Sequence, residues 1–329
     1  MQLFTLAVIV FSVVCPIVDA QSPGGRGAAS NPKSNEDLGV DIDRFIGRAS
    51  DSPTHLSHGL LLTHSMLRAG DPNHPGNHGA VLEYYKDIST AALLPKNHTP
   101  MVKLPDQFLF YVQSGEGRLE DGERYWDLRE NIAVLVPPNA SHRFVNDSGQ
   151  PLNMIMITWT PTGAPRQDIL VRDINMLPWC EEAVHWNNAS KCVFSAPDGL
   201  FQSERMLLVM LQPRAMSQPH SHPPGMNEIW VKVTPGNTTI LMGSELREMP
   251  QNTAYMVPPT NETEHANLNL TTDHVDWYLY WARNAPTPAG SAPSTANANA
   301  GRGARPANPN VVRDRTSAEA ANIAGKPLK

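Results

Sequence analysis

The sequence predicts an all-β protein with two domains and with disordered tails at both ends. Three observations predict this fold class. Short β-rich runs alternate with Pro, Gly, Asn and Asp between residues 81 and 281, and no long helical period occurs. The 329 residues suit two domains of ordinary size. Residues 21–41 and 286–329 are rich in small and polar residues, so we expect both segments to be disordered.

Residues 1–20 form an apolar run that ends in Val18-Asp19-Ala20, a pattern typical of a cleaved signal peptide. A retained membrane anchor and a lipid-modified Cys15 are the alternatives. Pro16 and Asp19 interrupt the run well short of a full span, so we expect no stable membrane span. The sequence therefore predicts a secreted protein, extracellular or, in a bacterium, periplasmic.

The charge balance argues against a nucleic-acid-binding protein. The chain carries 26 Lys and Arg against 32 Asp and Glu, a formal net charge of −6, and its folded part shows no basic patch. The tail 286–329 carries six basic and two acidic residues. This tail is either a solvated linker or a segment that holds the protein near an anionic surface.

The first domain is expected over residues 42–165. Its predicted strands cover residues 60–67, 81–85, 90–94, 108–112, 132–136, 142–145 and 152–159. The loop 71–79 contains His74 and His78. We interpret both as solvated residues rather than metal ligands, because no strand fixes their geometry.

A junction is expected over residues 166–192 and the second domain over residues 193–285. The predicted strands of the second domain cover residues 206–212, 229–233, 240–242, 254–257 and 275–281. Cys180 and Cys192 remain in the chain after removal of the signal peptide. In an oxidising compartment they can form a disulfide that contributes about 3 kcal/mol of stability, and two unpaired thiols are the alternative.

The sequence also carries an excess of acceptor sites for N-linked glycans. Seven Asn-x-Ser/Thr sequons occur, at Asn97, Asn139, Asn146, Asn188, Asn237, Asn261 and Asn269. Chance would supply about three. The excess favours a eukaryotic glycoprotein, whereas the turn-rich polar sequence of a bacterial protein would give the same count.

Four residues of the second domain form a candidate metal site. His220 and His222 are separated by one residue, so on extended backbone their side chains point the same way and can share an ion. Glu228 opens the next predicted strand, and His265 follows a Pro-Pro turn that can bring a further strand back beside the first. Three neutral imidazoles and a carboxylate suit one divalent Mn, Fe, Cu, Ni or Zn ion better than Ca or Mg. The alternative is a set of surface histidines in a proline-rich loop.

The motif His220-x-His222, Glu228 and His265, with a glycine turn at Gly236, resembles the two motifs of the cupin superfamily. The resemblance implies two double-stranded jelly-roll barrels in tandem, which is the bicupin arrangement. It also implies that the metal ion lies inside the second barrel, held by the three histidines and the glutamate. Two extra residues before the last histidine depart from the family pattern.

The first domain resembles a cupin barrel with a degenerate metal site. His142 corresponds to His265, and an alignment on the glycine turns places Gln107 at the position of Glu228. The His-x-His pair has no clear counterpart, because only His98 lies nearby and its spacing differs. Loss of a carboxylate and of an imidazole weakens divalent binding by far more than about tenfold. We therefore expect a structural or substrate-shaping role for the first barrel.

Four further residues are candidates for acid–base work: Glu262, Glu264, Asp276 and Tyr278. The two glutamates lie on the loop before the last histidine, where solubilising charge is the alternative. Asp276 and Tyr278 share one face of a predicted strand with Tyr280. That polar face either looks into the barrel and reaches the site, or lies at the barrel entrance while the opposite, aromatic face fills the core.

The resemblance implies a secreted, metal-dependent bicupin. Four protein ligands leave one or two positions on the ion open, which is typical of a catalytic site. We expect an oxidoreductase, of an oxygenase or oxalate-degrading type, that acts on a small-molecule carboxylate or hydroxylated substrate, with Met226 and Trp230 as an apolar wall. The alternative is a non-catalytic module that binds a metal or a carbohydrate. A homo-oligomer is compatible with this sequence.

Overall fold

Antiparallel strands form nearly all of the regular structure, as the all-β prediction requires. The computed structural model describes residues 33–161, 165–180, 187–201, 204–222, 224–260, 262–283 and 315–328. Helical structure in these residues is limited to α1 (Asn35–Leu38), α2 (Arg315–Ala320) and the 3-10 turns η1 (Ile42–Phe45), η2 (Ala49–Asp51), η3 (Ile174–Met176) and η4 (Ala196–Asp198). The expected signal peptide lies outside the described residues. No helix in the described ranges is long and apolar enough to cross a membrane.

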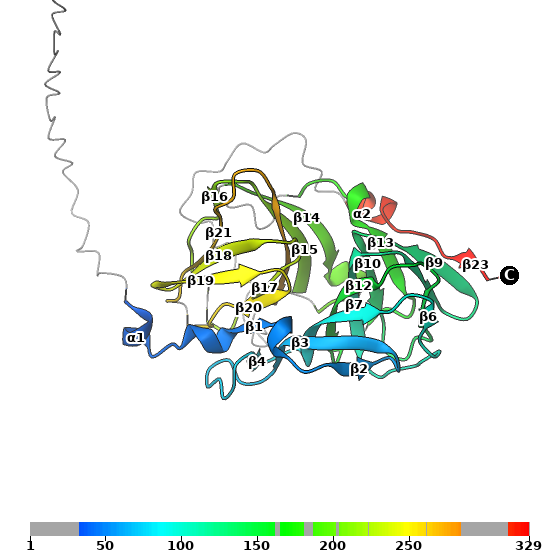
Figure 1. The fold of residues 1–329 in the computed structure, drawn as a ribbon, viewed down its shortest axis with the longest axis horizontal. Coiled ribbons are helices and arrows are strands. Elements are labelled where there is room, and N and C mark those ends of the chain that lie inside the picture. The colour runs from blue at the N-terminus through cyan, green and yellow to red at the C-terminus, as the bar shows by residue number, and fades with distance from the viewer. Residues whose placement is uncertain are drawn as a thin grey trace, which may run out of the picture. The chain divides into compact units, whose positions relative to one another are not determined.

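The first barrel consists of two sheets (Figure 1). The larger sheet contains, in spatial order, β13 (Leu170–Asp173), β10 (Ile132–Val136), β7 (Gln107–Ser114), β12 (Leu152–Trp159), β5 (Asp87–Leu93), β3 (Leu61–Ala69) and β2 (His55–Ser57), with β4 (Ala80–Leu82) beside β3. The smaller sheet contains β23 (Lys326–Pro327), β9 (Arg124–Leu128), β8 (Gly117–Glu120), β11 (Arg143–Asn146) and β6 (Asn97–His98). Phe110, Val134 and Phe144 pack together between the sheets. These strands therefore enclose an apolar interior.

The second barrel repeats this arrangement. Its larger sheet contains β1 (Ile46–Arg48), β20 (Thr253–Met256), β17 (Asn227–Lys232), β22 (Asp276–Arg283), β15 (Glu204–Leu211) and β14 (Asn188–Ser195). Its smaller sheet contains β16 (Ala215–Met216), β21 (His265–Asn269), β18 (Asn237–Met242) and β19 (Glu245–Pro250). The expected pair of double-sheet barrels in tandem is thus present.

The two larger sheets are joined by a continuous apolar core. Leu109 and Ile155, on one face of the first barrel's larger sheet, belong to the same core as Leu207 and Leu279 of the second barrel. Both faces of β7, β10 and β12 are therefore buried. Burial on both faces explains why these strands are nearly continuous apolar runs rather than alternating ones.

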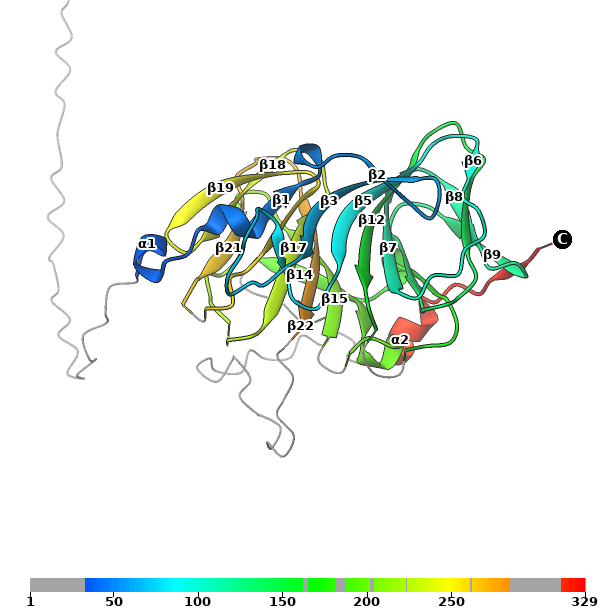
Figure 2. The same ribbon diagram turned by 90° about the horizontal axis from the view of Figure 1, so that it is seen from below.

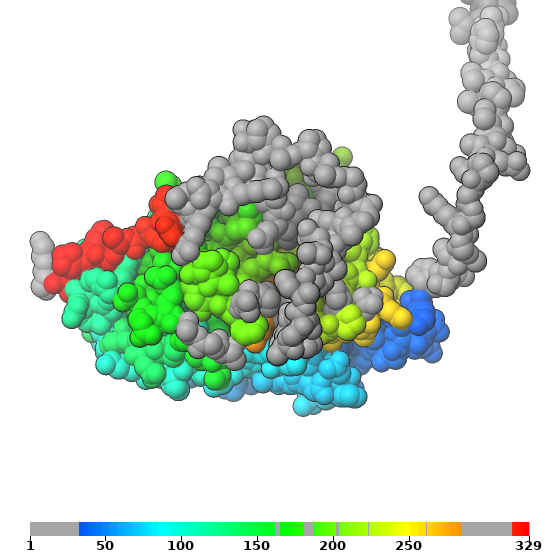
Figure 3. All heavy atoms as spheres, turned by 180° about the vertical axis from the view of Figure 1, so that it is seen from behind, coloured from blue at the N-terminus to red at the C-terminus, as the bar shows by residue number. Residues whose placement is uncertain are grey.

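The two ends of the described chain cross over between the barrels. Strand β1, which the predicted boundaries assign to the first barrel, pairs instead with β20 of the second, with Ile46 opposite Tyr255. At the other end, β23 pairs with β9 of the first barrel. Figure 2 shows β23 beside β9, and Figure 3 shows the red C-terminal segment lying along the surface of the first barrel. Each barrel is thus completed by a strand from the opposite end of the sequence.

These ends correct two expectations of disorder. Within the segment 21–41, α1 contacts the second barrel, where the Asn35 amide donates hydrogen bonds to the Met242 carbonyl and the Glu245 carboxylate, each at 3.0 Å. Within the tail 286–329, Ile323 donates to the Val171 carbonyl at 2.8 Å and accepts from the Trp126 indole at 3.0 Å. Within these segments, residues 33–41 and 315–328 are thus docked on the barrels by backbone and amide hydrogen bonds.

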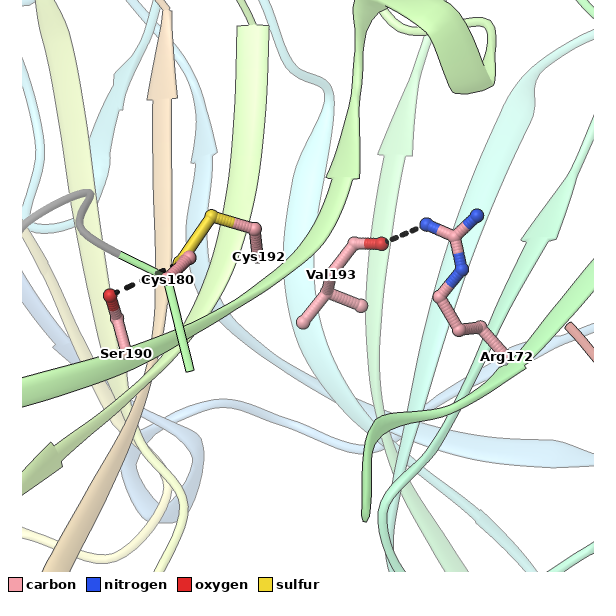
Figure 4. The surroundings of a disulfide bond; sticks show 5 residues. All are labelled: Arg172, Cys180, Ser190, Cys192 and Val193. Carbon is pink, nitrogen blue, oxygen red and sulfur yellow. Dashed lines mark hydrogen bonds between the residues drawn. A yellow bond between two sulfur atoms is a disulfide. The ribbon is translucent and has the colours of Figure 1, made fainter. Parts of the chain in front are cut away.

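The junction expected over residues 166–192 is largely absorbed by the barrels. Strand β13 pairs with β10 of the first barrel, and β14 begins at Asn188 in the second. Cys180 and Cys192 form the expected disulfide, with their Cα atoms 5.9 Å apart. Figure 4 shows this bond beside the Ser190 hydroxyl, which lies 3.4 Å from the Cys180 sulfur. The disulfide therefore fixes residue 180 to a strand of the second barrel.

Several sequon asparagines have structural roles instead of free side chains. Asn146 and Asn269 are fully buried. The Asn146 amide donates to the Leu93 and Gln150 carbonyls, and the Asn269 amide donates to the Leu211 and His274 carbonyls, at 2.8–3.2 Å. Asn188 is buried as well. A glycan at Asn146 or Asn269 would break these bonds, so part of the sequon excess reflects turn chemistry.

Candidate metal centre

The four side chains singled out by their spacing converge at one point in the second barrel. One ligand atom from each of His220, His222, Glu228 and His265 lies within 4.8 Å of the others. The three imidazole ring centres lie 4.5–5.1 Å apart. The alternative, in which these histidines are scattered over a proline-rich surface loop, is therefore excluded.

Both sheets of the second barrel contribute to this cluster. Glu228 is on β17 of the larger sheet, and His265 begins β21 of the smaller one. His220 is paired with His265 through backbone hydrogen bonds of 3.0 and 3.4 Å. His222 follows two residues later and points to the same place, as the period of two requires for extended chain. A short strand pairing thus brings residues 45 positions apart in the sequence side by side.

The Glu228 carboxylate is held by two neighbouring side chains. The Trp230 indole donates a hydrogen bond of 2.7 Å to Glu228 Oε1, and the Tyr280 hydroxyl donates one of 3.0 Å to Oε2. Arg205 in turn donates to the Tyr280 oxygen at 3.3 Å. These bonds fix the orientation of the carboxylate, which is how outer partners tune metal ligands.

The ring nitrogens of the histidines are arranged to suit a metal ion. His220 Nδ1 lies 2.9 Å from the Gln218 carbonyl, which only accepts, so Nδ1 carries the proton and Nε2 is the nitrogen that can bind a metal. His222 Nε2 and His265 Nε2 lie 2.7 and 2.8 Å from the Glu228 oxygens. The distances would suit hydrogen bonds, but the directions do not, and both nitrogens are buried without a hydrogen-bond partner. Such orphaned atoms around a carboxylate fit a divalent transition metal.

The protonation states also suit a metal. Burial lowers the pKa of His220 to about 3, so its imidazole is neutral. Burial by itself would raise the pKa of Glu228, but the neighbouring His222 and His265 lower it well below the usual range. Metal ligands must be deprotonated in this way. His265 and Glu228 are almost fully buried, whereas the His222 side chain is 13% exposed, so the cluster opens to solvent on the His220–His222 side.

The structure does not bring the two loop glutamates into the cluster. The Glu262 side chain is half exposed and forms an ion pair with Lys33 at 2.9 Å. Glu264 is exposed, and its backbone carbonyl accepts a hydrogen bond from Gly243. Proximity in sequence to His265 did not place either carboxylate beside it, because successive side chains of an extended chain point to opposite faces and Glu262 pairs with Lys33 instead.

Asp276 and Tyr278 do face the barrel interior, but at a different level. Ala282 is the strand neighbour of Glu228, so Asp276 lies six residues away, about 20 Å along the strand. Asp276 is fully buried and pairs with Lys232, and the Tyr278 hydroxyl donates to Thr238 at 3.0 Å. The polar face is thus the inner one. Of its residues, Tyr280 is the one that contacts the candidate ligand Glu228. Sequence alternation identified the face but not the level.

Tyr280 therefore offers a direct test of this geometry. Replacing Tyr280 with Phe removes the hydroxyl that orients Glu228, and we expect the dissociation constant for Zn²⁺ or Mn²⁺ to rise about 10- to 100-fold. Tyr278→Phe is the matched control, because it removes a buried hydroxyl from the same strand face without touching Glu228. Isothermal titration would measure both. Equal affinities in the two variants would contradict the role of Tyr280.

The first barrel has lost three of the four ligands. Its backbone bridge between Val102 and His142 corresponds to the bridge between His220 and His265. Val102 thus takes the place of His220, and Leu104, two residues on, takes that of His222. Both side chains are apolar, and Leu104 packs against the barrel core. Because these apolar side chains replace the histidines, the first barrel lacks the ligand set of the second.

The strand register also corrects the residue that replaces the carboxylate. Phe108 is opposite Val136 and Thr158, just as Glu228 is next to Val257 and Ala282. Phe108, and not Gln107, therefore occupies the glutamate position. Counting from the glycine turn gave Gln107 because the stretch from Phe108 to Gly115 is one residue shorter than the stretch from Glu228 to Gly236. The Gln107 amide instead lies 3.5 Å from the Gly199 carbonyl.

Comparisons with known proteins agree with this architecture. A family model of the cupin domain matches residues 95–158, within the first barrel. AerE from Microcystis aeruginosa is 14% identical over 73% of this chain and 100% of its own, with a TM-score of 0.55. Vicilin from hazelnut, Corylus avellana, is 10% identical over 74% of this chain and 86% of its own, with a TM-score of 0.55.

A third solved structure of similar fold is an oxalate decarboxylase in complex with formate, from Lactobacillus farciminis. It is 12% identical over 74% of this chain and 87% of its own, with a TM-score of 0.54. No curated protein matches the sequence. At these identities the likeness establishes the fold and not the activity. Two barrels of this topology, together with the family match, identify the chain as a bicupin, a two-barrel member of the cupin superfamily.

Proposed function

We propose that this bicupin is a metal-dependent oxidoreductase that acts on a small carboxylate or hydroxylated substrate in its second barrel. The observation that carries the proposal is the convergence of three imidazoles and a carboxylate, within 4.8 Å of one another, at a point that opens to solvent on one side. A closed structural site would offer no such access.

The bound ion would supply either electron transfer to O₂ or, with zinc, Lewis acidity. His220, His222, Glu228 and His265 would hold it. Trp230 and Tyr280 fix the carboxylate, and Met226, which is buried beside Trp230 in the barrel core, contributes to an apolar wall. An apolar wall excludes water and strengthens the electrostatic interactions at the open side.

Arg205 supports an anionic substrate. It is opposite Ala282, which is opposite Glu228, so the three residues are in line across neighbouring strands and project to the same face. The Arg205 guanidinium is therefore close to the Glu228 carboxylate. It donates a hydrogen bond to the Tyr280 hydroxyl, which in turn donates one to Glu228. A fixed positive charge at this position favours a carboxylate in the pocket. One structural neighbour is described as an oxalate decarboxylase in complex with formate, which is a small carboxylate.

The disulfide supports the further proposal that the protein works in an oxidising compartment, outside the cell or in the periplasm. Bonds of this kind are rare in the reducing cytosol. Fractionation of the native source and thiol titration of the purified chain would test this location directly.

A non-catalytic binding module is the second candidate, because the same fold occurs both in vicilin and in an oxalate decarboxylase and does not choose between the two classes. Turnover by metal-loaded protein separates the two. We expect O₂ uptake or CO₂ release with at least one small carboxylate when Mn, Fe or Cu is bound, and loss of this turnover in Glu228→Gln. Glu264→Gln is the matched control, since its carboxylate is exposed on the nearby loop. Ligand binding without turnover across all five candidate metals would favour the binding module.

A further inference from the structure

The first barrel contains a second pair of histidines that the degenerate motif does not explain. His58 lies on the turn between β2 and β3, and its side chain enters the barrel interior, where only 5% of the residue is exposed. Its ring centre lies 5.1 Å from that of His142, 4.8 Å from Phe108 and 5.5 Å from Phe110. His58 therefore occupies the space left beside His142 by the lost ligands.

Both of these imidazoles have an unsatisfied nitrogen. Nε2 of His58 and Nε2 of His142 are buried and have no hydrogen-bond partner in the described residues. His142 Nδ1 lies 2.9 Å from the Ala140 carbonyl, so Nδ1 carries the proton and Nε2 presents a lone pair. His58 Nδ1 lies 2.8 Å from the Ser57 hydroxyl. Burying two nitrogens without hydrogen-bond partners is unfavourable, so a ligand for them has a physical reason.

The two histidines are surrounded by apolar, uncharged side chains. The aromatic rings beside His58 belong to Phe108, Phe110 and Phe144, which provide no negative charge. The Met156 sulfur lies 4.0 Å from the Ser57 hydroxyl, which contacts Nδ1 of His58 and not Nε2. Burial lowers the pKa of both histidines, that of His58 to about 3, so both rings are neutral. Neutral imidazole donors without a carboxylate favour a monovalent ion over a divalent one.

We propose that His58 and His142 bind a monovalent copper ion through their Nε2 atoms. The cost of burying an ion rises with the square of its charge, so an apolar barrel with neutral ligands accepts Cu⁺ far more readily than Cu²⁺. The first barrel has thus replaced the divalent ligand set at the His142 position with a different one. This site does not depend on the activity proposed for the second barrel.

The test uses the full chain in a His220→Asn/His222→Asn background, which weakens the second-barrel site. Cu⁺ is titrated without oxygen against the chromophoric chelator bicinchoninate. We expect one tightly bound Cu⁺ per chain. The affinity should fall about 100-fold or more in His58→Asn and in His142→Gln. Asparagine is chosen at position 58 because the backbone φ there is 49°, a region that asparagine tolerates.

His98→Asn is the matched control, because His98 is an exposed histidine of the same barrel. It should bind Cu⁺ like the background chain. Thermal unfolding with and without Ag⁺, a redox-inert mimic, separates lost binding from lost folding: Ag⁺ should raise the Tm of the control but not that of His58→Asn. Equal Cu⁺ affinity in His58→Asn and His98→Asn, or no tight Cu⁺ in the background chain, overturns the proposal and leaves a trapped water as the partner of the two nitrogens.

Discussion

Replacing Glu228 with Gln is expected to raise the dissociation constant for a divalent metal by about 100-fold or more. The substitution keeps the side-chain size, but it removes the anionic ligand and places an amide opposite His222 Nε2 and His265 Nε2, at present 2.7 and 2.8 Å from the carboxylate. Element analysis of natively purified protein and titration of the metal-free chain would measure this loss.

Glu264→Gln provides the control for that experiment. It removes one negative charge from an exposed loop next to His265 and leaves the ligand set intact, so we expect metal content equal to that of the unmodified chain. If Glu228→Gln retains as much metal as Glu264→Gln, the four converging side chains are not the ligands.

Replacing Lys232 with Met should destabilise the second barrel by about 3–5 kcal/mol. Lys232 and Asp276 form an ion pair in which both side chains are fully buried. The substitution keeps the length of the side chain but leaves the Asp276 charge in the barrel without its partner. Denaturant unfolding followed by tryptophan fluorescence would measure the change in the free energy of unfolding.

The double variant Lys232→Met/Asp276→Leu should recover most of this loss, because replacing both charges with apolar groups leaves no unpaired ion. Lys33→Met is the comparison for an exposed pair, since Lys33 and Glu262 are half exposed, and we expect it to cost less than about 1 kcal/mol. Metal affinity should change little in all three variants. A double variant as unstable as Lys232→Met alone would show that the lysine contributes through packing rather than through its charge.

The convergence of most of the candidate metal ligands could be predicted because the geometry of His220, His222 and Glu228 is local. The alternation of side chains fixes the His220–His222 pair, and the strand that begins at Glu228 follows within a few residues. The acid–base candidates could not be predicted in this way. Tyr278 and Tyr280 share one face, and only the pairing of β22 with β17 shows which of them reaches Glu228.

Register explains the other differences from expectation. A one-residue difference in the length of the chain before the glycine turn moved the alignment of the first barrel from Phe108 to Gln107, and nothing in the local sequence marks it. The crossed ends were also hidden. Strand β1 has three residues, and its partner β20 is far along the chain, so no periodic pattern links them. The position of His58 inside the first barrel likewise follows from a turn whose closing geometry the sequence does not specify.

The crossed ends affect how the chain folds during synthesis and how a truncated fragment behaves. Ile46 can pair with Tyr255 only after a further 209 residues have been synthesised. Strand β9 gains its last neighbour only when residue 326 has been synthesised. Neither barrel can therefore close on the ribosome as the chain emerges, and long-range pairing of this kind slows folding. A fragment that ends between the barrels would present bare strand edges at β20 or β9, and such edges invite aggregation.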